Sequence, residues 1–210
     1  QNRITKAYNE FIEKNSNLTL EEMASPHLIE GVGEKHNKSK ELCMDFLNIG
    51  RSDEIVSQVK KILGNDIILW GMHCMHKEAK TGKKIPWHQD GTYWPIEPKA
   101  TCSVWIAITD VDENNGCMKF IPKSHKLGVL PHLQEDKVKD DGELKGSLDL
   151  KIDESSFDEN KSVNCVIKKG QVSLHDTYLL HSSDANFSDQ PRKAMVLRYM
   201  PSSSLFDRSK

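Results

Sequence analysis

Apolar residues in the first 64 positions recur at helical spacing. Between residues 4 and 12 they follow steps of three and four, which marks one face of an amphipathic helix. A second helix is expected over residues 40–47. A third should begin at the polar triplet 52–54 and stop at Gly64, since glycine is common just past a helix end. Residues 1–64 are therefore predicted to form a helical preface.

After Gly64 the pattern changes to short apolar segments separated by turn signals. The segments cover residues 67–70, 102–108, 118–121, 163–167, 172–175 and 194–200. Asn114-Asn115-Gly116 and Lys169-Gly170 are typical of turns between strands. We predict a mainly β fold, a β-sandwich or a jelly roll, with flanking helices packed outside. Residues 65–201 would form its core, within a single domain of residues 1–210.

Residues 131–161 form a charged stretch that is poor in aromatic residues. One interpretation is a solvated surface insertion. The other is a lid over an active site, because long loops on rigid β scaffolds often serve that purpose.

Composition limits the partners of the chain. Its 210 residues are 37% apolar, enough for a sizeable core, and its formal net charge is −2. No basic field is present to recruit nucleic acid or an anionic membrane, and the apolar runs are too short to span a bilayer. The five cysteines form no CxxC pair, and no signal peptide is visible. A reducing, cytoplasmic setting and a small-molecule partner are expected.

Three separated residues are candidates for a metal site. His88 and Asp90 are two positions apart, so on an extended strand both side chains point to the same face. A third ligand has to come from elsewhere in the chain. His181 follows the apolar pair Leu179-Leu180, on a predicted strand, and opens a polar turn. Two histidines and one carboxylate on one face are the ligand set of non-haem Fe(II) oxygenases.

Arg192 lies eleven residues after His181, beside the apolar segment 194–200. A guanidinium at the edge of a β scaffold can hold a carboxylate through two parallel charge-assisted hydrogen bonds. Taken singly, each of these residues more often has an ordinary surface or core role. The order His-X-Asp, a long gap, His and then Arg favours the metal site.

Several motifs occur in a fixed order between residues 67 and 201. They are Trp87-His88-Gln89-Asp90-Gly91, Val104-Trp105-Ile106-Ala107-Ile108, Asn115-Gly116-Cys117, Ile121-Pro122-Lys123-Ser124-His125-Lys126, Leu180-His181-Ser182-Ser183, and Arg192 leading into Arg198-Tyr199. In this order they resemble the phytanoyl-CoA dioxygenase family of Fe(II)- and 2-oxoglutarate-dependent oxygenases, particularly its small bacterial-type members. The resemblance implies a double-stranded β-helix, a distorted jelly roll of the cupin type.

The same resemblance implies a role for each matching residue. His88, Asp90 and His181 would hold Fe(II). Arg192, helped by the Ser183 hydroxyl, would bind the distal carboxylate of 2-oxoglutarate.

Two further residues are implied at the co-substrate pocket. Trp105 would line it. His73 occupies a position where relatives place another residue that touches 2-oxoglutarate, although it could equally pair with a buried polar group. His175 is expected to be a local polar partner or to lie behind the metal ligands. Lys123 stands where the family has glycine, which concerns the geometry of one turn.

The implied activity is hydroxylation of a small organic metabolite by O2, with conversion of 2-oxoglutarate to succinate and CO2. Asp90 favours hydroxylation, because halogenating relatives have a small residue at that position. Tyr93 and Trp94, just past the ligand pair, are candidates for substrate contact or for the core.

Two other functions stay open on the residues alone. One is a jelly-roll enzyme that uses a metal non-oxidatively, as an isomerase or hydrolase; the pair of Arg192 and Ser183 argues against it. The other is a catalytically inactive binding domain of the same fold, against which the complete ligand set argues.

Overall fold

Three α-helices and two four-stranded antiparallel sheets make up most of the computed structural model, which describes residues 2–18, 21–30, 35–134 and 150–207. The helices are α1 (Asn2–Lys14), α2 (Lys40–Gly50) and α3 (Asp53–Leu63). Short 3₁₀ helices occur at Glu21–Met23, Asp90–Thr92, Ser124–Leu127, Glu154–Ser156 and Glu159–Lys161. Among the described residues, no helix is both long and apolar enough to cross a membrane.

The strands form two principal sheets and two small ones. The first sheet has the order β1 (Ile67–Lys77), β11 (Arg192–Pro201), β4 (Cys102–Ala107) and β9 (Val172–Asp176). The second has the order β2 (Ile85–His88), β10 (His181–Ser183), β5 (Met118–Phe120) and β8 (Val163–Cys165). The small sheets pair β12 (Leu205–Phe206) with β3 (Ile96–Glu97), and β6 (His132–Gln134) with β7 (Leu150–Ile152).

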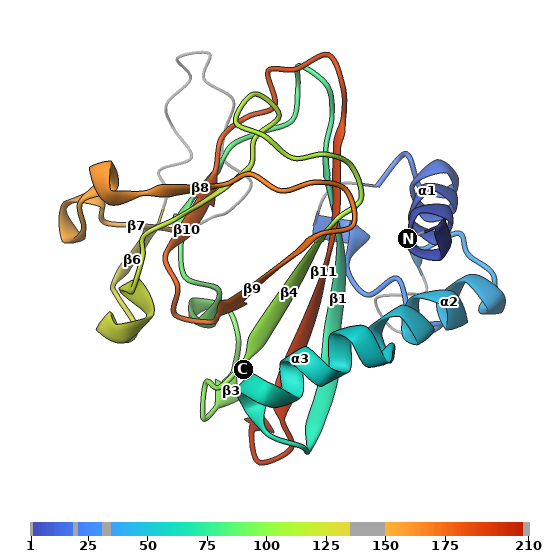
Figure 1. Cartoon of the computed structure of the whole chain (residues 1–210), viewed down its shortest axis with the longest axis horizontal. Helices are drawn as coiled ribbons and strands as arrows, with labels where there is room; N and C mark the ends of the chain where they lie inside the picture. The colour runs from blue at the N-terminus through green and yellow to red at the C-terminus, as the bar shows by residue number, and fades with distance from the viewer. Residues whose placement is uncertain (1, 19–20, 31–34, 135–149, 208–210) are drawn as a thin grey trace.

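Helix ends fall where the sequence predicts them. The Ser39 side chain accepts a hydrogen bond from the Leu42 amide and caps the start of α2. Ser52 precedes α3, and Gly64 ends it with a positive φ of 93° that favours glycine. The three helices lie together on one side of the β1–β11–β4–β9 sheet, and the second sheet lies on the other (Figure 1).

Successive side chains along each strand of the first sheet point to opposite faces of the sheet, as expected for a β-strand. Along β4, Val104 and Ile106 pack against the helices, whereas Trp105 and Ala107 face the second sheet. The helical layer supplies Tyr8, Phe11 and Phe46, among others, to the same core. The outer face of the first sheet is therefore covered by the helices, and its inner face lines the space between the two sheets.

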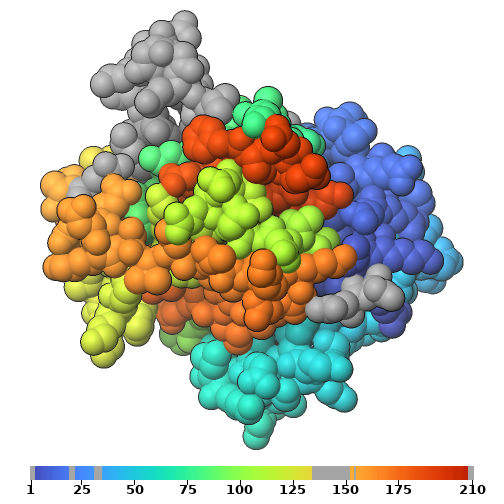
Figure 2. Space-filling view, turned by 45° about the horizontal axis from the view of Figure 1, so that its top comes forward, coloured from blue at the N-terminus to red at the C-terminus, as the bar shows by residue number. Residues whose placement is uncertain are grey.

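The N-terminal helix also reaches the last third of the chain. Figure 2 shows the blue N-terminal segment against the red segment near residue 190 on the same face. Lys193 Nζ donates a hydrogen bond to Asn9 Oδ1 at 3.0 Å there, and the Tyr8 hydroxyl donates to the Met75 carbonyl at 3.2 Å. Segments far apart in sequence thus hold the helical preface to the sheet.

Most strand boundaries differ from the prediction by one to a few residues, and three differences bear on the site. The predicted strand at residues 67–70 continues to Lys77, because its later polar residues face the interior of the jelly roll while Met72 and Cys74 pack on the helices. Leu179-Leu180 is not a strand, and His181 begins β10 instead of following a strand. β2 ends at His88, and Asp90 opens a 3₁₀ turn.

The C-terminal flank of the charged stretch packs on the second sheet. Ile152 is fully buried in a cluster with Trp87, and the Trp87 indole nitrogen donates to Glu159 Oε1 at 3.1 Å. The centre of this stretch, residues 135–149, for which the sequence allows a surface insertion or a lid, lies outside the described residues.

Replacing Tyr199 by phenylalanine should lower the free energy of unfolding by about 1–2 kcal/mol. The buried Tyr199 hydroxyl donates to the Gly50 carbonyl at 2.7 Å, joining β11 to the end of α2, and phenylalanine leaves that carbonyl without a donor. Urea denaturation measures the change. The matched control, Tyr178→Phe at a partly buried position, should stay within about 0.5 kcal/mol of the wild type. Equal losses in the two variants would contradict this assignment.

Candidate metal centre

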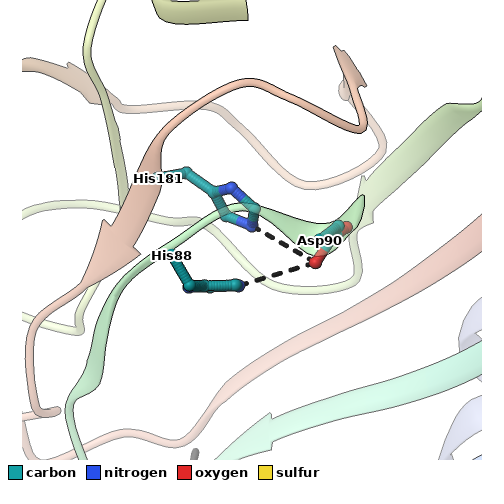
Figure 3. A group of neighbouring side chains, drawn as sticks. All are labelled: His88, Asp90 and His181. Carbon is teal, nitrogen blue, oxygen red and sulfur yellow. Dashed lines mark ion pairs between the residues drawn. The ribbon is translucent and has the colours of Figure 1, made fainter. Parts of the chain in front are cut away.

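His88, Asp90 and His181 converge between the two sheets. The Nε2 atoms of His88 and His181 lie 3.5 and 3.7 Å from Asp90 Oδ1 (Figure 3). One ligand atom from each residue lies within 4.8 Å of the others, and all three residues are buried. The structure therefore brings together the three residues that the sequence proposed as a metal site.

Strand pairing produces this convergence. His181, the first residue of β10, is the antiparallel partner of His88, the last residue of β2, and the two ring centroids are 4.1 Å apart. The Leu180 amide donates to Ser124 Oγ at 2.8 Å, so the turn at Ser124–Leu127 fixes the residue before His181. Lys123, which stands where the family resemblance implies glycine, has a φ of 67°, in the left-handed region that favours glycine.

Gln89 and Gly91 set the position of Asp90. The Gln89 side chain points away from the metal site, where its amide donates to the Tyr178 carbonyl at 2.6 Å and its Oε1 accepts from Leu130 at 2.8 Å. A Cβ atom at Gly91 would lie 2.8 Å from Thr177 Oγ1, so only glycine fits this close approach. These two neighbours explain why the residues around the aspartate are Gln and Gly.

Each histidine has one nitrogen directed at the carboxylate and the other at a backbone carbonyl. Nδ1 of His88 is 2.8 Å from the Pro86 carbonyl, and Nδ1 of His181 is 2.9 Å from the Leu179 carbonyl. Because a carbonyl only accepts, Nδ1 carries the hydrogen and Nε2 keeps its lone pair. Burial, with the nearby His88, also lowers the pKa of His181 to about 3, so its ring is neutral near pH 7.

Asp90 is the ionised member of the group. Burial alone would raise its pKa, but the surrounding polar groups, the His175 ring first among them, outweigh this and hold the pKa well below its usual range. Its second oxygen accepts from Ser103 Oγ at 3.5 Å and lies 3.8 Å from His175 Nε2. Two imidazole lone pairs and a carboxylate oxygen thus face one another with no hydrogen between them. A bound cation would pair with all three of these electron-rich atoms. Two imidazole nitrogens and one carboxylate oxygen are a ligand set that suits Fe(II).

A cavity of about 140 Å³ adjoins this group. Its lining includes the four residues that the sequence proposed for the co-substrate, His73, Trp105, Ser183 and Arg192. His73 also forms a backbone bridge with Ala24.

Arg192 is a buried charge in this cavity. Its side chain is 1% exposed, and its guanidinium carbon lies 5.2 Å from the centre of the Trp105 ring. Burial lowers its pKa to about 10, which still leaves it charged near pH 7. Nε has no hydrogen-bond partner, and no described carboxylate lies within ion-pair distance. A buried, unpaired guanidinium is costly, so the cavity is suited to an anion at this end.

Tyr93 and Trp94 lie beside the cavity, not in its lining. They line a neighbouring surface groove together with Leu205 and Phe206. Tyr93 is 37% exposed, and the Trp94 ring packs edge-on against Trp70 with centroids 4.8 Å apart.

The sequence interpretation assigned no role to two residues of this region. Arg198 lines the cavity on the same face of β11 as Arg192, and the alternating positions of that strand could have indicated it. His132, the first residue of β6, accepts a hydrogen bond at Nε2 from the backbone amide of Gln89 at 3.1 Å. It lies 43 residues from Gln89, and the residues around it give no local signal. His175, expected behind the ligands, does lie there.

The sequence profile of the phytanoyl-CoA dioxygenase (PhyH) family matches residues 7–194. The peroxisomal phytanoyl-CoA dioxygenase of Bos taurus is 30% identical over 152 residues, which are 70% of this chain and 43% of that protein. The chain therefore spans less than half the length of this curated relative.

Solved structures share the fold. The non-heme monooxygenase ThoJ, in its apo form, has a TM-score of 0.70 and 21% sequence identity over 97% of this chain and 71% of that one. EctD from S. alaskensis, solved with 2-oxoglutarate and 5-hydroxyectoine, has a TM-score of 0.70 and 18% identity over 97% of this chain and 68% of that one. These similarities confirm the predicted jelly roll with flanking helices.

Replacing Lys77 by methionine should lower the free energy of unfolding by about 2–4 kcal/mol. Lys77 is 2% exposed, and its Nζ donates to the backbone carbonyls of Lys83 at 2.8 Å, Ser183 at 3.3 Å and Asp184. Methionine fills the space but leaves three carbonyls without this donor, next to the end of β10. Thermal and urea denaturation measure the loss.

The control is Lys80→Met, three residues further along the chain. Lys80 and its ion-pair partner Asp189 have side chains 58% and 84% exposed, so the change should cost less than about 1 kcal/mol. A Lys77 variant as stable as the Lys80 variant would show that the buried lysine does not hold this segment.

Proposed function

Because the chain belongs to the phytanoyl-CoA dioxygenase family, we propose that it is an Fe(II)- and 2-oxoglutarate-dependent dioxygenase that hydroxylates a small organic metabolite. The observation that supports this best is the convergence of two imidazole nitrogens and one carboxylate beside a cavity that also contains an unpaired guanidinium. The fold shared with an enzyme solved with 2-oxoglutarate is consistent with that co-substrate. Residues 1–210 would act as one dioxygenase domain.

His88 and His181 would hold the iron through Nε2, and Asp90 through Oδ1. When bound there, iron and 2-oxoglutarate supply the oxidation by O2, in which the co-substrate becomes succinate and CO2 and the substrate gains a hydroxyl group. The backbone carbonyls behind both histidines keep the Nε2 lone pairs directed at the metal position. Ser103 and His175 orient the carboxylate from its other oxygen.

Arg192 would bind the distal carboxylate of 2-oxoglutarate, with the Ser183 hydroxyl beside it. Its guanidinium offers a planar pair of donors, and stacking on Trp105 restricts its orientation. His73 lines the cavity, opposite Val196 on β11, and would contact the co-substrate there.

Apolar side chains would limit the access of water. Met75, Ile85, Met118 and Val196 line the same cavity and come from both sheets. A dry wall strengthens the electrostatic interactions of the polar residues and suppresses side reactions of the oxidant.

Neither alternative function accounts for this cavity as well. A non-oxidative metalloenzyme has no need for a buried guanidinium placed beside the metal position. A binding domain that had lost its activity would have no reason to keep all three ligand atoms within 4.8 Å of one another.

Replacing His88 or Asp90 by alanine should weaken iron binding and lower iron-dependent succinate formation by about 100-fold or more, because each change removes a ligand that no neighbour replaces. Metal analysis after dialysis and a coupled succinate assay measure the two effects. His125→Ala is the control, since His125 is exposed in a turn away from the cavity lining. Retained iron affinity in both ligand variants would contradict the assignment.

Arg192→Met should raise the 2-oxoglutarate dissociation constant about 10- to 150-fold, which corresponds to loss of a charge-assisted contact of about 1.5–3 kcal/mol. Calorimetric titration of the metal-loaded protein measures it, and the adjacent Lys193→Met serves as control. An unchanged constant in the Arg192 variant would place the co-substrate elsewhere.

A further inference from the structure

A second guanidinium, that of Arg198, belongs to the same cavity. Arg192, Val196 and Arg198 occupy alternate positions of β11, so all three face the space between the sheets, and all three line the cavity. On the neighbouring strands Arg198 is paired with Gly71 and Ser103. A Cβ atom at Gly71 would lie 3.9 Å from Arg198 Cβ and 4.0 Å from its Cδ, so the stem of the arginine rests on that glycine.

The guanidinium plane of Arg198 packs on an aromatic ring, but its charge has no ion-pair partner among the described residues. The guanidinium carbon lies 5.2 Å from the centre of the Trp94 ring. Nε is buried without a hydrogen-bond partner, and the ion pairs of the described residues do not include Arg198. Asp90 is the acid that attracts it electrostatically, but the oxygens of Asp90 already face His88, His181 and His175.

The two guanidiniums occupy different parts of the cavity. Arg192 stacks on Trp105, whose strand neighbour is Val196 in the middle of β11. Arg198 stacks on Trp94, which packs against Trp70 and also lines the surface groove beside the cavity. The Arg198 guanidinium therefore faces the groove side, the side from which a molecule other than the co-substrate can approach.

The charge of the lining points to the kind of molecule. Apart from the imidazoles, the lining groups that carry charge are one carboxylate, Asp90, and two guanidiniums. A ferrous ion and doubly charged 2-oxoglutarate cancel each other, so the loaded cavity keeps one excess positive charge. The lining is mostly apolar and Arg198 is half-buried, so an anion that pairs with that charge is favoured.

We propose that Arg198 recognises an acidic group of the substrate, a carboxylate or a phosphonate, and that the enzyme therefore acts on small organic acids. This inference rests on the proposed function, because it assigns the co-substrate to Arg192. Arg198 would act as a specificity-determining residue, forming parallel charge-assisted hydrogen bonds with the acid while Trp94 holds its plane.

The test uses the Mn(II)-loaded protein, which binds ligands without turnover. The first titration is with 2-oxoglutarate. Arg198→Met should keep the wild-type dissociation constant within about twofold, whereas Arg192→Met should not. A wild type that fails to bind 2-oxoglutarate would contradict the proposed function itself, and a loss in Arg198→Met as large as in Arg192→Met would assign Arg198 to the co-substrate and overturn the inference.

The second titration adds benzoate, phenylphosphonate or the neutral isostere benzamide to the complex saturated with 2-oxoglutarate. The wild type should bind at least one of the two acids more tightly than it binds benzamide, by about tenfold or more. Arg198→Met should lose that preference, and Arg198→Lys, which keeps the charge and guards against a folding defect, should retain part of it. No preference for acids in the wild type, or an undiminished preference in Arg198→Met, would overturn the inference.

Discussion

The pairing of His181 with His88 across β10 and β2 is the contact on which the site depends. It joins residues that are far apart in the chain, and a shift of one residue would turn one imidazole to the opposite face of the sheet. Ser124 holds the approach to β10, and Lys77 holds the segment that leaves it. The register of a three-residue strand is thus secured by hydrogen bonds from outside the sheet.

The cavity contains electrostatic interactions that the protein does not complete by itself. Lone pairs of His88 and His181 face an ionised carboxylate, and two buried guanidinium Nε atoms lack partners. Each of these features lowers stability, since buried polar groups are normally paired. Gathered around one cavity, they are typical of a site organised for its ligands in advance. The helical layer and the apolar core supply the stability that this arrangement needs.

Much of this architecture could be predicted from the sequence. The helices were readable because polar N-terminal residues and Gly64 mark their ends, and β4 and β11 because their apolar residues are continuous. The candidate metal ligands, which the structure brings together, are indicated in the sequence by their motif and order. The sequence predicts β1 too short, because polar residues such as His73 face the cavity between the sheets and resemble a loop in sequence. His132 and the packing of Ile152 depend on contacts between distant segments, which local patterns do not contain.

The central claim is that His88, Asp90 and His181 hold one ferrous ion to which 2-oxoglutarate binds. Anaerobic titration of the protein with Fe(II) and 2-oxoglutarate, followed by visible absorption, tests it most directly. The account predicts a weak charge-transfer band that appears only when both are present, saturates at one equivalent of each, and is absent from His181→Ala. The absence of a band in the wild type, or an identical band in His181→Ala, would contradict it.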